Sequence, residues 1–95
     1  MRHFVATDVT ALVGEIFGVN IYRKIDKEIN FHTAENINDI IILKFPGKVI
    51  TVNESWVRGF FLPMVVRGNL DKYRFKASVH IKDKIKNAFH RLDWL

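Results

Sequence analysis

The apolar run from Ile40 to Phe45, IIILKF, is the feature that most restricts how this chain can fold. β-Branched residues favour extended backbone, and apolar residues at successive positions are typical of a strand covered on both faces. Turn-forming residues precede the run at 35–39, and Pro46 and Gly47 follow it. We therefore expect a central strand of a largely parallel sheet at 40–45.

A helical repeat precedes this run. Ile21, Ile25 and Ile29 recur at every fourth residue, with charged side chains between them. This spacing places the three isoleucines on one face of a helix, which is therefore predicted from Val19 to Thr33. A capped turn is expected ahead of it, over residues 8–11.

A more apolar helix is predicted after a short extended piece at 49–52. Its large side chains form two adjoining rows at a spacing of four residues: Trp56, Val57, Phe60, Phe61, Met64 and Val65. Gly59 lies beside these aromatics, where it would let another backbone approach closely. Pro63 removes a backbone hydrogen bond, so a kink or an early end is expected near it. Gly68 and Asn69 are the expected stop.

The remaining segments complete an alternating order. A short first strand is expected at 3–6, and the alternating stretch 73–79 predicts a basic edge strand. A final amphipathic helix is marked by five residues: Ile81, Ile85, Ala88, Phe89 and Leu92. Strands that alternate with helices predict an α/β sandwich, with helices packed against a mostly parallel central sheet of about four strands. A chain of this length is expected to form one domain over 1–95.

Catalytic and metal-binding patterns do not stand out. The chain has no cysteine, its five glycines are scattered, and no acid pair suggests acid–base chemistry. Its four histidines lack close helical spacing: His3, His32, His80 and His90. We expect a protein that is not an enzyme and needs no metal or cofactor. No apolar run approaches the length of a membrane span, so we also expect a cytoplasmic protein without membrane contact.

The net charge of +5 favours acidic partners, nucleic acid among them. Basic residues cluster in three separate segments: Arg23, Lys24 and Lys27; Lys72, Arg74 and Lys76; and Lys82, Lys84 and Lys86. A solvated basic coat is the favoured interpretation, because the aromatic residues occupy core-like positions instead of alternating with the bases. A small basic nucleic-acid-binding protein is the alternative, and it requires these bases to converge on one face.

The junction before the apolar helix holds the candidate site. Asn53 and Ser55 are both good helix caps, and if Asn53 is the cap then Ser55 can face solvent. An exposed Ser55 could be read by a partner or phosphorylated, since a helix N-terminus tolerates negative charge. Trp56 is either an exposed interface anchor or a core residue packed on the sheet.

The order of elements and this junction together resemble the STAS domain, the fold of bacterial anti-anti-sigma factors. The likeness is closer to the small STAS-like proteins of the DUF4325 family, and the matching residues run from Val19 to Leu92. Anti-anti-sigma factors carry an Asp-Ser-Ser-Gly motif at this junction, and its second Ser is phosphorylated. The motif falls on residues 53–56, Asn-Glu-Ser-Trp, so that Ser55 alone is kept.

The resemblance implies a single STAS-like domain that acts as a regulatory protein–protein interaction module. The partner it implies is a regulatory protein such as a histidine-kinase-like ATPase. Contact is expected around the helix start, at Asn53, Glu54, Ser55, Trp56 and Arg58, with Ser55 as the candidate phosphorylation site. Oligomeric state is left open, because so apolar a helix could equally pack against a second copy.

Overall fold

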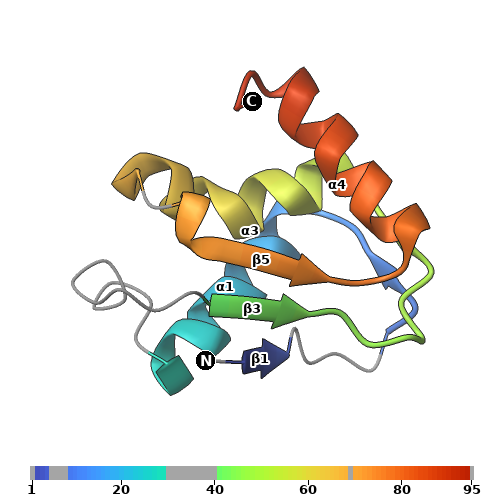
Figure 1. The fold of residues 1–95 in the computed structure, drawn as a ribbon, viewed down its shortest axis with the longest axis horizontal. Helices are drawn as coiled ribbons and strands as arrows, with labels where there is room; N and C mark the ends of the chain where they lie inside the picture. Colours follow the sequence, from blue (N-terminus) through green and yellow to red (C-terminus); the bar gives the residue numbers. More distant parts are fainter. Residues whose placement is uncertain (1, 5–8, 30–40, 69, 95) are drawn as a thin grey trace.

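The computed structural model describes residues 2–4, 9–29, 41–68 and 70–94 (Figure 1). The elements follow one another in this order: β1 (Arg2–Phe4), β2 (Ala11–Leu12), α1 (Glu15–Ile29), β3 (Ile41–Lys44), β4 (Thr51–Val52), α3 (Glu54–Arg67), the short 3₁₀ helix η1 (Leu70–Lys72), β5 (Tyr73–Lys76) and α4 (Val79–Arg91). Strands alternate with helices, so the predicted α/β class is confirmed.

The strands divide into two groups instead of forming one sheet of about four strands. β3 lies in the middle of a parallel three-stranded sheet with the order β1-β3-β5. β2 and β4 form a separate parallel pair, in which Ala11 lies opposite Thr51 and Leu12 opposite Val52. The pair was missed because β2 falls where the sequence predicted only a capped turn.

Burial along β3 alternates, which corrects the expectation of a strand covered on both faces. Ile41 and Leu43 are buried, whereas Ile42 and Lys44 are only half-buried. Figure 1 shows α1 and α3 on one side of the sheet and α4 beyond β5. The run of isoleucines misled the prediction, because Ile42 adds an apolar residue to the outer face.

The two central helices pack with their backbones close together at a pair of glycines. A Cβ atom on Gly59 would collide with the backbone carbonyl oxygen of Glu15, and one on Gly18 would collide with that of Trp56. The predicted role of Gly59 in close approach is thus confirmed, and Gly18 allows the same close approach from the side of α1. Helices pack this closely only where a side chain is missing on the contacting face.

The bounds of both helices differ from the predicted ones. α1 begins at Glu15, four residues before the predicted start, directly after Gly14 in a left-handed conformation with φ of 94°. α3 continues past Pro63 to Arg67, so of the two alternatives predicted at this proline, a kink or an early end, the early end is wrong. It stops at Gly68 as predicted, with φ of 72° and its N–H donated to the Met64 and Val65 carbonyls.

β5 and α4 are a strand and a helix, as predicted, although the end of β5 differs from the predicted one. β5 ends at Lys76, earlier than predicted, because the Ser78 hydroxyl caps α4 by accepting the Ile81 N–H at 3.3 Å. β5 is an edge strand, as its basic alternation predicted. The capped turn at residue 8, the end of the first predicted helix at 30–33 and His32 lie outside the described residues. Among the helices that the structure describes, none combines the length and the apolarity needed to cross a membrane.

Candidate functional site

Asn53 is the cap of α3, which decides between the two candidate caps. Its backbone is extended, and its Oδ1 accepts the Trp56 N–H at 2.9 Å. Oδ1 also accepts the N–H of Gly14, immediately before α1, at 3.3 Å. One amide oxygen therefore serves the beginnings of both helices, and first-turn N–H groups are the donors that helix geometry leaves unpaired.

The short strand pair brings these two helix starts together. The Ile50 N–H donates to the Thr10 carbonyl at 2.8 Å, and the Asn53 N–H donates to the Leu12 carbonyl at 3.0 Å. The first bond extends the β2–β4 ladder at its beginning, and the second extends it up to the cap of α3. The first turns of the two helices consequently form one continuous surface.

Ser55 is exposed on the first turn of α3. Since Asn53 supplies the cap, the Ser55 hydroxyl is not needed to satisfy the helix start. A substituent on this hydroxyl would project towards solvent at the positive end of the helix dipole, where negative charge is tolerated.

Trp56 belongs to the core and not to this surface. Its side chain is 0 % exposed and is stacked on Phe60, with ring centroids 4.8 Å apart. Phe45 and Phe61 meet it edge-on, at 6.0 and 6.3 Å. Within the described part of the chain, its Nε1 has no hydrogen-bond partner. Of the two interpretations left open by the sequence, the structure shows the packed one, so Trp56 presents no side chain for a partner to contact.

Two exposed ion pairs flank Ser55. The Glu54 carboxylate accepts a hydrogen bond from Arg91 of α4 at 2.5 Å, and Arg58 lies 3.7 Å from Glu15 of α1. All four side chains are 42–61 % exposed, so water screens both pairs strongly. Glu15 and Arg91 had not been singled out, because they are far from residue 55 in sequence and no local spacing connects them.

We call these residues the α3-start surface: Glu15, Asn53, Glu54, Ser55, Arg58 and Arg91. It carries two acids and two bases, and an uncharged hydroxyl lies between the pairs. Its formal charge is therefore balanced. A negative charge added at Ser55 would make this surface net negative.

The basic residues converge only in part. Lys44, Arg74 and Lys76 share the outer face of the sheet, with Lys44 and Lys76 side by side in register. Arg74 is held there by bonds from its Nη1 to the Asp71 and Tyr73 carbonyls, at 2.6 and 3.0 Å.

The other basic segments lie elsewhere. Arg23, Lys24 and Lys27 are exposed on α1, which covers the opposite face of the sheet (Figure 1). Lys82 and Lys86 are exposed on α4, while Lys84 of the same helix is half-buried. The described bases thus do not gather on one face.

His80 and His90 are exposed on α4. Over the described residues, no group of three His, Asp or Glu side chains could hold a metal ion. Comparison of the chain with protein-family models, with curated proteins and with solved structures gives no match.

Proposed function

We propose that this chain is a non-enzymatic regulatory protein–protein interaction module with a STAS-like fold, and that its partner contacts the α3-start surface. The observation that carries the proposal is the exposed Ser55 hydroxyl, which is not needed as a cap because Asn53 supplies one. Charge can therefore be added at this position without a loss of the contacts that hold the helix start.

Phosphorylation of Ser55 gives the surface a switch. Ser55 and Arg58 are three residues apart on α3, a spacing that brings side chains to the same helix face. A phosphate adds about −1.5 to −2 charges and binds arginine more strongly than a carboxylate at 3.7 Å does. It would draw Arg58 away from Glu15 and leave the surface negative, so a partner matched to the balanced surface would dissociate.

The order of elements, the parallel sheet and the serine at a strand–helix junction support the STAS-like part of the proposal. The partner that this likeness implies is a regulatory protein such as a histidine-kinase-like ATPase. Because fold alone does not establish function, the proposal depends on tests of Ser55 itself.

Site-specific photocrosslinking in source cells tests the contact surface. A photoreactive residue at position 55 should capture a discrete protein, and the same residue at Val66, exposed at the far end of α3, should not. Ser55→Asp should lower the yield of a crosslinker at Leu62, which is exposed one turn beyond Arg58, at least tenfold, and Ser55→Ala should leave it unchanged. Equal capture from positions 55 and 66, or equal yields with Asp and Ala, would overturn the proposal.

A small basic nucleic-acid-binding protein is the second candidate, favoured by Lys44, Arg74 and Lys76 on the outer sheet face. Affinity for single-stranded and duplex oligonucleotides, measured over a salt series, tests it. Affinity that falls steeply with salt, and that Lys76→Gln weakens more than Lys24→Gln, would support it. Absence of binding at low salt would exclude it.

A further inference from the structure

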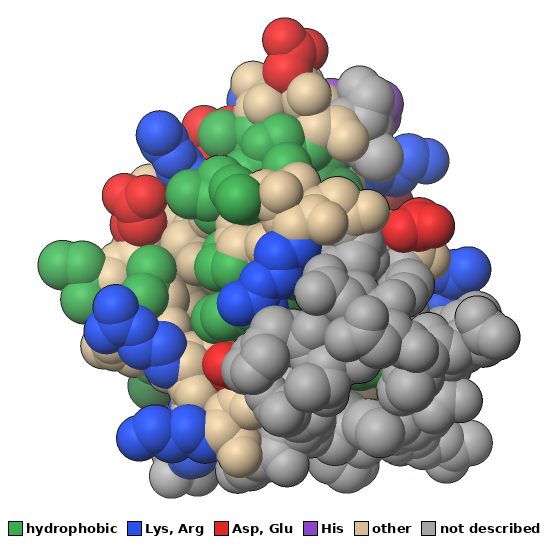
Figure 2. Space-filling model, turned by 90° about the vertical axis from the view of Figure 1, so that its left-hand side faces the viewer, with side chains coloured by type: hydrophobic (Ala, Val, Ile, Leu, Met, Phe, Trp, Pro, Cys, Tyr) green, Lys and Arg blue, Asp and Glu red, His purple; other side chains and the backbone are tan. Residues whose placement is uncertain are grey.

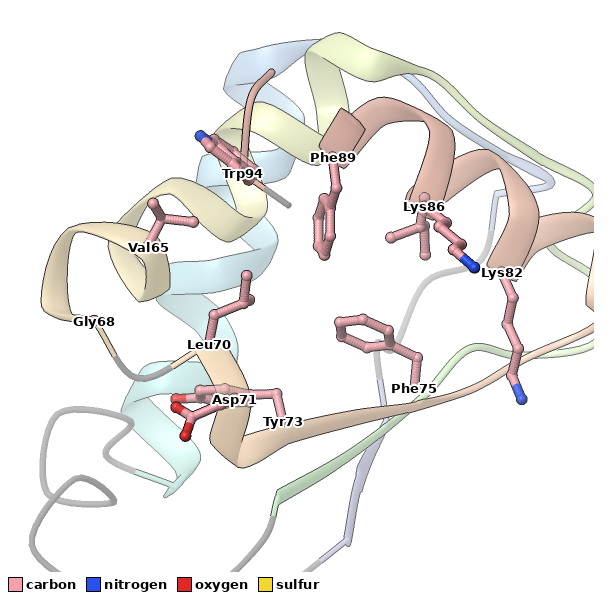
Figure 3. A pocket seen from close by; sticks show the side chains of 11 residues that line it. Val65, Gly68, Leu70, Asp71, Tyr73, Phe75, Lys82, Lys86, Phe89 and Trp94 are labelled. Atoms are coloured by element: carbon pink, nitrogen blue, oxygen red, sulfur yellow. The ribbon is translucent and has the colours of Figure 1, made fainter. Parts of the chain in front are cut away.

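A groove of about 810 Å³ lies between the end of α3, η1, β5 and α4 (Figure 3). Sites for small molecules commonly measure about 300–1,000 Å³ and are mainly apolar with a few polar groups. The groove has this character, since Val65, Leu70, Phe75, Phe89 and Trp94 line most of it. Figure 2 shows the end of the molecule where α3 stops, with apolar side chains gathered across its upper part and charged ones around them.

The apolar wall is fixed by the core beneath it. The rings of Phe75 and Phe89 lie 6.1 Å apart, and each lies 5.1 Å from the buried ring of Phe61. Trp94 packs on Phe89 at 5.6 Å and is only half-buried. A ligand would therefore meet a preformed surface and would not have to order it.

Charge is distributed unevenly around this wall. Lys82 and Lys86 are four residues apart on α4, so they lie on the same helix face, and both are exposed at one end of the groove. Asp71 lies towards the other end, with Phe75 and Phe89 between (Figure 3). The lining thus offers two cations at one end, an apolar middle and a single acid at the other end.

We infer that this groove binds a small amphipathic carboxylate with a saturated hydrocarbon chain, such as a medium-chain fatty acid. The carboxylate lies at Lys82 and Lys86, and the chain passes over Phe75 and Phe89 towards Leu70 and Trp94. Asp71 disfavours the opposite orientation, because it would repel the anionic group. The site shares no residue with the α3-start surface, so a test of ligand binding here is independent of the tests of the function proposed above.

Isothermal titration with octanoate, decanoate and dodecanoate, each below its micelle concentration, measures this binding. Every buried methylene should strengthen affinity by about fourfold until the groove is filled. Dodecanol, which has the same chain without the charge, should bind at least tenfold more weakly than dodecanoate. Equal affinity for the two would overturn the assignment of the lysines, and no binding across the series would overturn the site.

Matched lysine variants locate the charge. Lys82→Gln/Lys86→Gln should weaken dodecanoate at least tenfold and leave dodecanol unchanged. Lys24→Gln/Lys27→Gln removes the same charge from exposed positions on α1 and should change neither. An equal loss in the two double variants would show an effect of overall charge and would overturn the site.

Two further variants test the apolar part. Trp94→Phe should remove most of the ligand-induced change in tryptophan emission, since the remaining Trp56 is buried in the core. Val65→Trp fills the groove and should abolish binding while circular dichroism shows an intact fold. Unchanged affinity in folded Val65→Trp would overturn the proposal, as would a concentration-dependent dimer of the wild-type chain that this variant abolishes.

Discussion

α1 and α3 make two kinds of contact, one between buried backbone atoms and one between exposed side chains, and the two differ in what they contribute to stability. Within the first two turns of each helix the backbones meet at Gly18 and Gly59, where no added atom can be accommodated. At their starts the helices are joined by the Asn53 amide and the exposed pair Arg58–Glu15. The buried contact fixes the fold, whereas the exposed one can be changed at small cost. A surface whose charge is to be regulated is best placed where the contacts are exposed, because they can change without unfolding the chain.

Gly59→Ala should have the largest effect on stability. The new methyl group would overlap the Glu15 carbonyl, a backbone atom that cannot move without shifting α1. Overpacking of this kind should lower the free energy of unfolding by about 3 kcal/mol or more, measured by urea denaturation. Gly47→Ala is the control, because nothing lies within 4 Å of its added Cβ. Equal stabilities for the two variants would contradict the close backbone contact.

Asn53→Ala should have the second-largest effect on stability. It removes the acceptor of the Trp56 N–H and of the Gly14 N–H, which should lower the free energy of unfolding by about 1 kcal/mol. Ser55→Ala should change it by less than about 0.5 kcal/mol, because that side chain is exposed and does not cap the helix. Thermal or urea unfolding of both variants decides the matter, and a larger loss for Ser55→Ala would reassign the cap.

Removal of the Arg58–Glu15 pair should matter less for stability. A double-mutant cycle with Arg58→Ala and Glu15→Ala should give a coupling free energy below about 1 kcal/mol that decreases as salt is added. The same cycle at Arg91 and Glu54 provides the internal comparison, since that pair is shorter. A coupling unaffected by salt would show that the pairs are more shielded from water than their exposure indicates.

The smallest expected effect on the free energy of unfolding comes from the ionisation of Tyr22, and it should appear only at alkaline pH. Burial raises the pKa of Tyr22, although Arg67, which donates a hydrogen bond to its hydroxyl at 2.7 Å, acts in the opposite direction. The folded state therefore holds this proton more tightly than the unfolded state does. Its contribution to stability is complete below the ordinary pKa of 10.0 and is lost as the pH rises through the folded-state pKa. Unfolding measured from pH 8 to 11 should show a decline that Tyr22→Phe reduces, and an identical decline in the variant would contradict this origin.

The periodicity of apolar residues predicted the helices well, but it did not predict which faces of the strands are buried. The spacing of Ile21 and Ile25 predicted α1, and the residue types at 53–55 predicted a cap followed by a helix. The run at 40–45 could not reveal that Ile42 is half-buried, because burial depends on which elements cover each face. β2 is too short for any period to be detected.

The sequence predicted only those residues of the candidate site that are neighbours in the chain. Asn53 and Ser55 could be selected because capping preferences are local. Trp56 could not be placed from the sequence, since an aromatic residue on a helix serves equally well as an anchor or as core. Glu15 and Arg91 became visible only when the tertiary structure brought α1 and α4 beside α3.

Arg91 and Glu54 are 37 positions apart in the sequence and Glu15 contacts Arg58 from another helix, so the α3-start surface is a discontinuous epitope. A peptide spanning residues 53–58 would contain Ser55 and Arg58 but neither Glu15 nor Arg91. A protein that reads the whole surface would therefore recognise the native chain and ignore unfolded copies or fragments of it. By mass action, each such binding event would also protect the fold of the chain that it recognises.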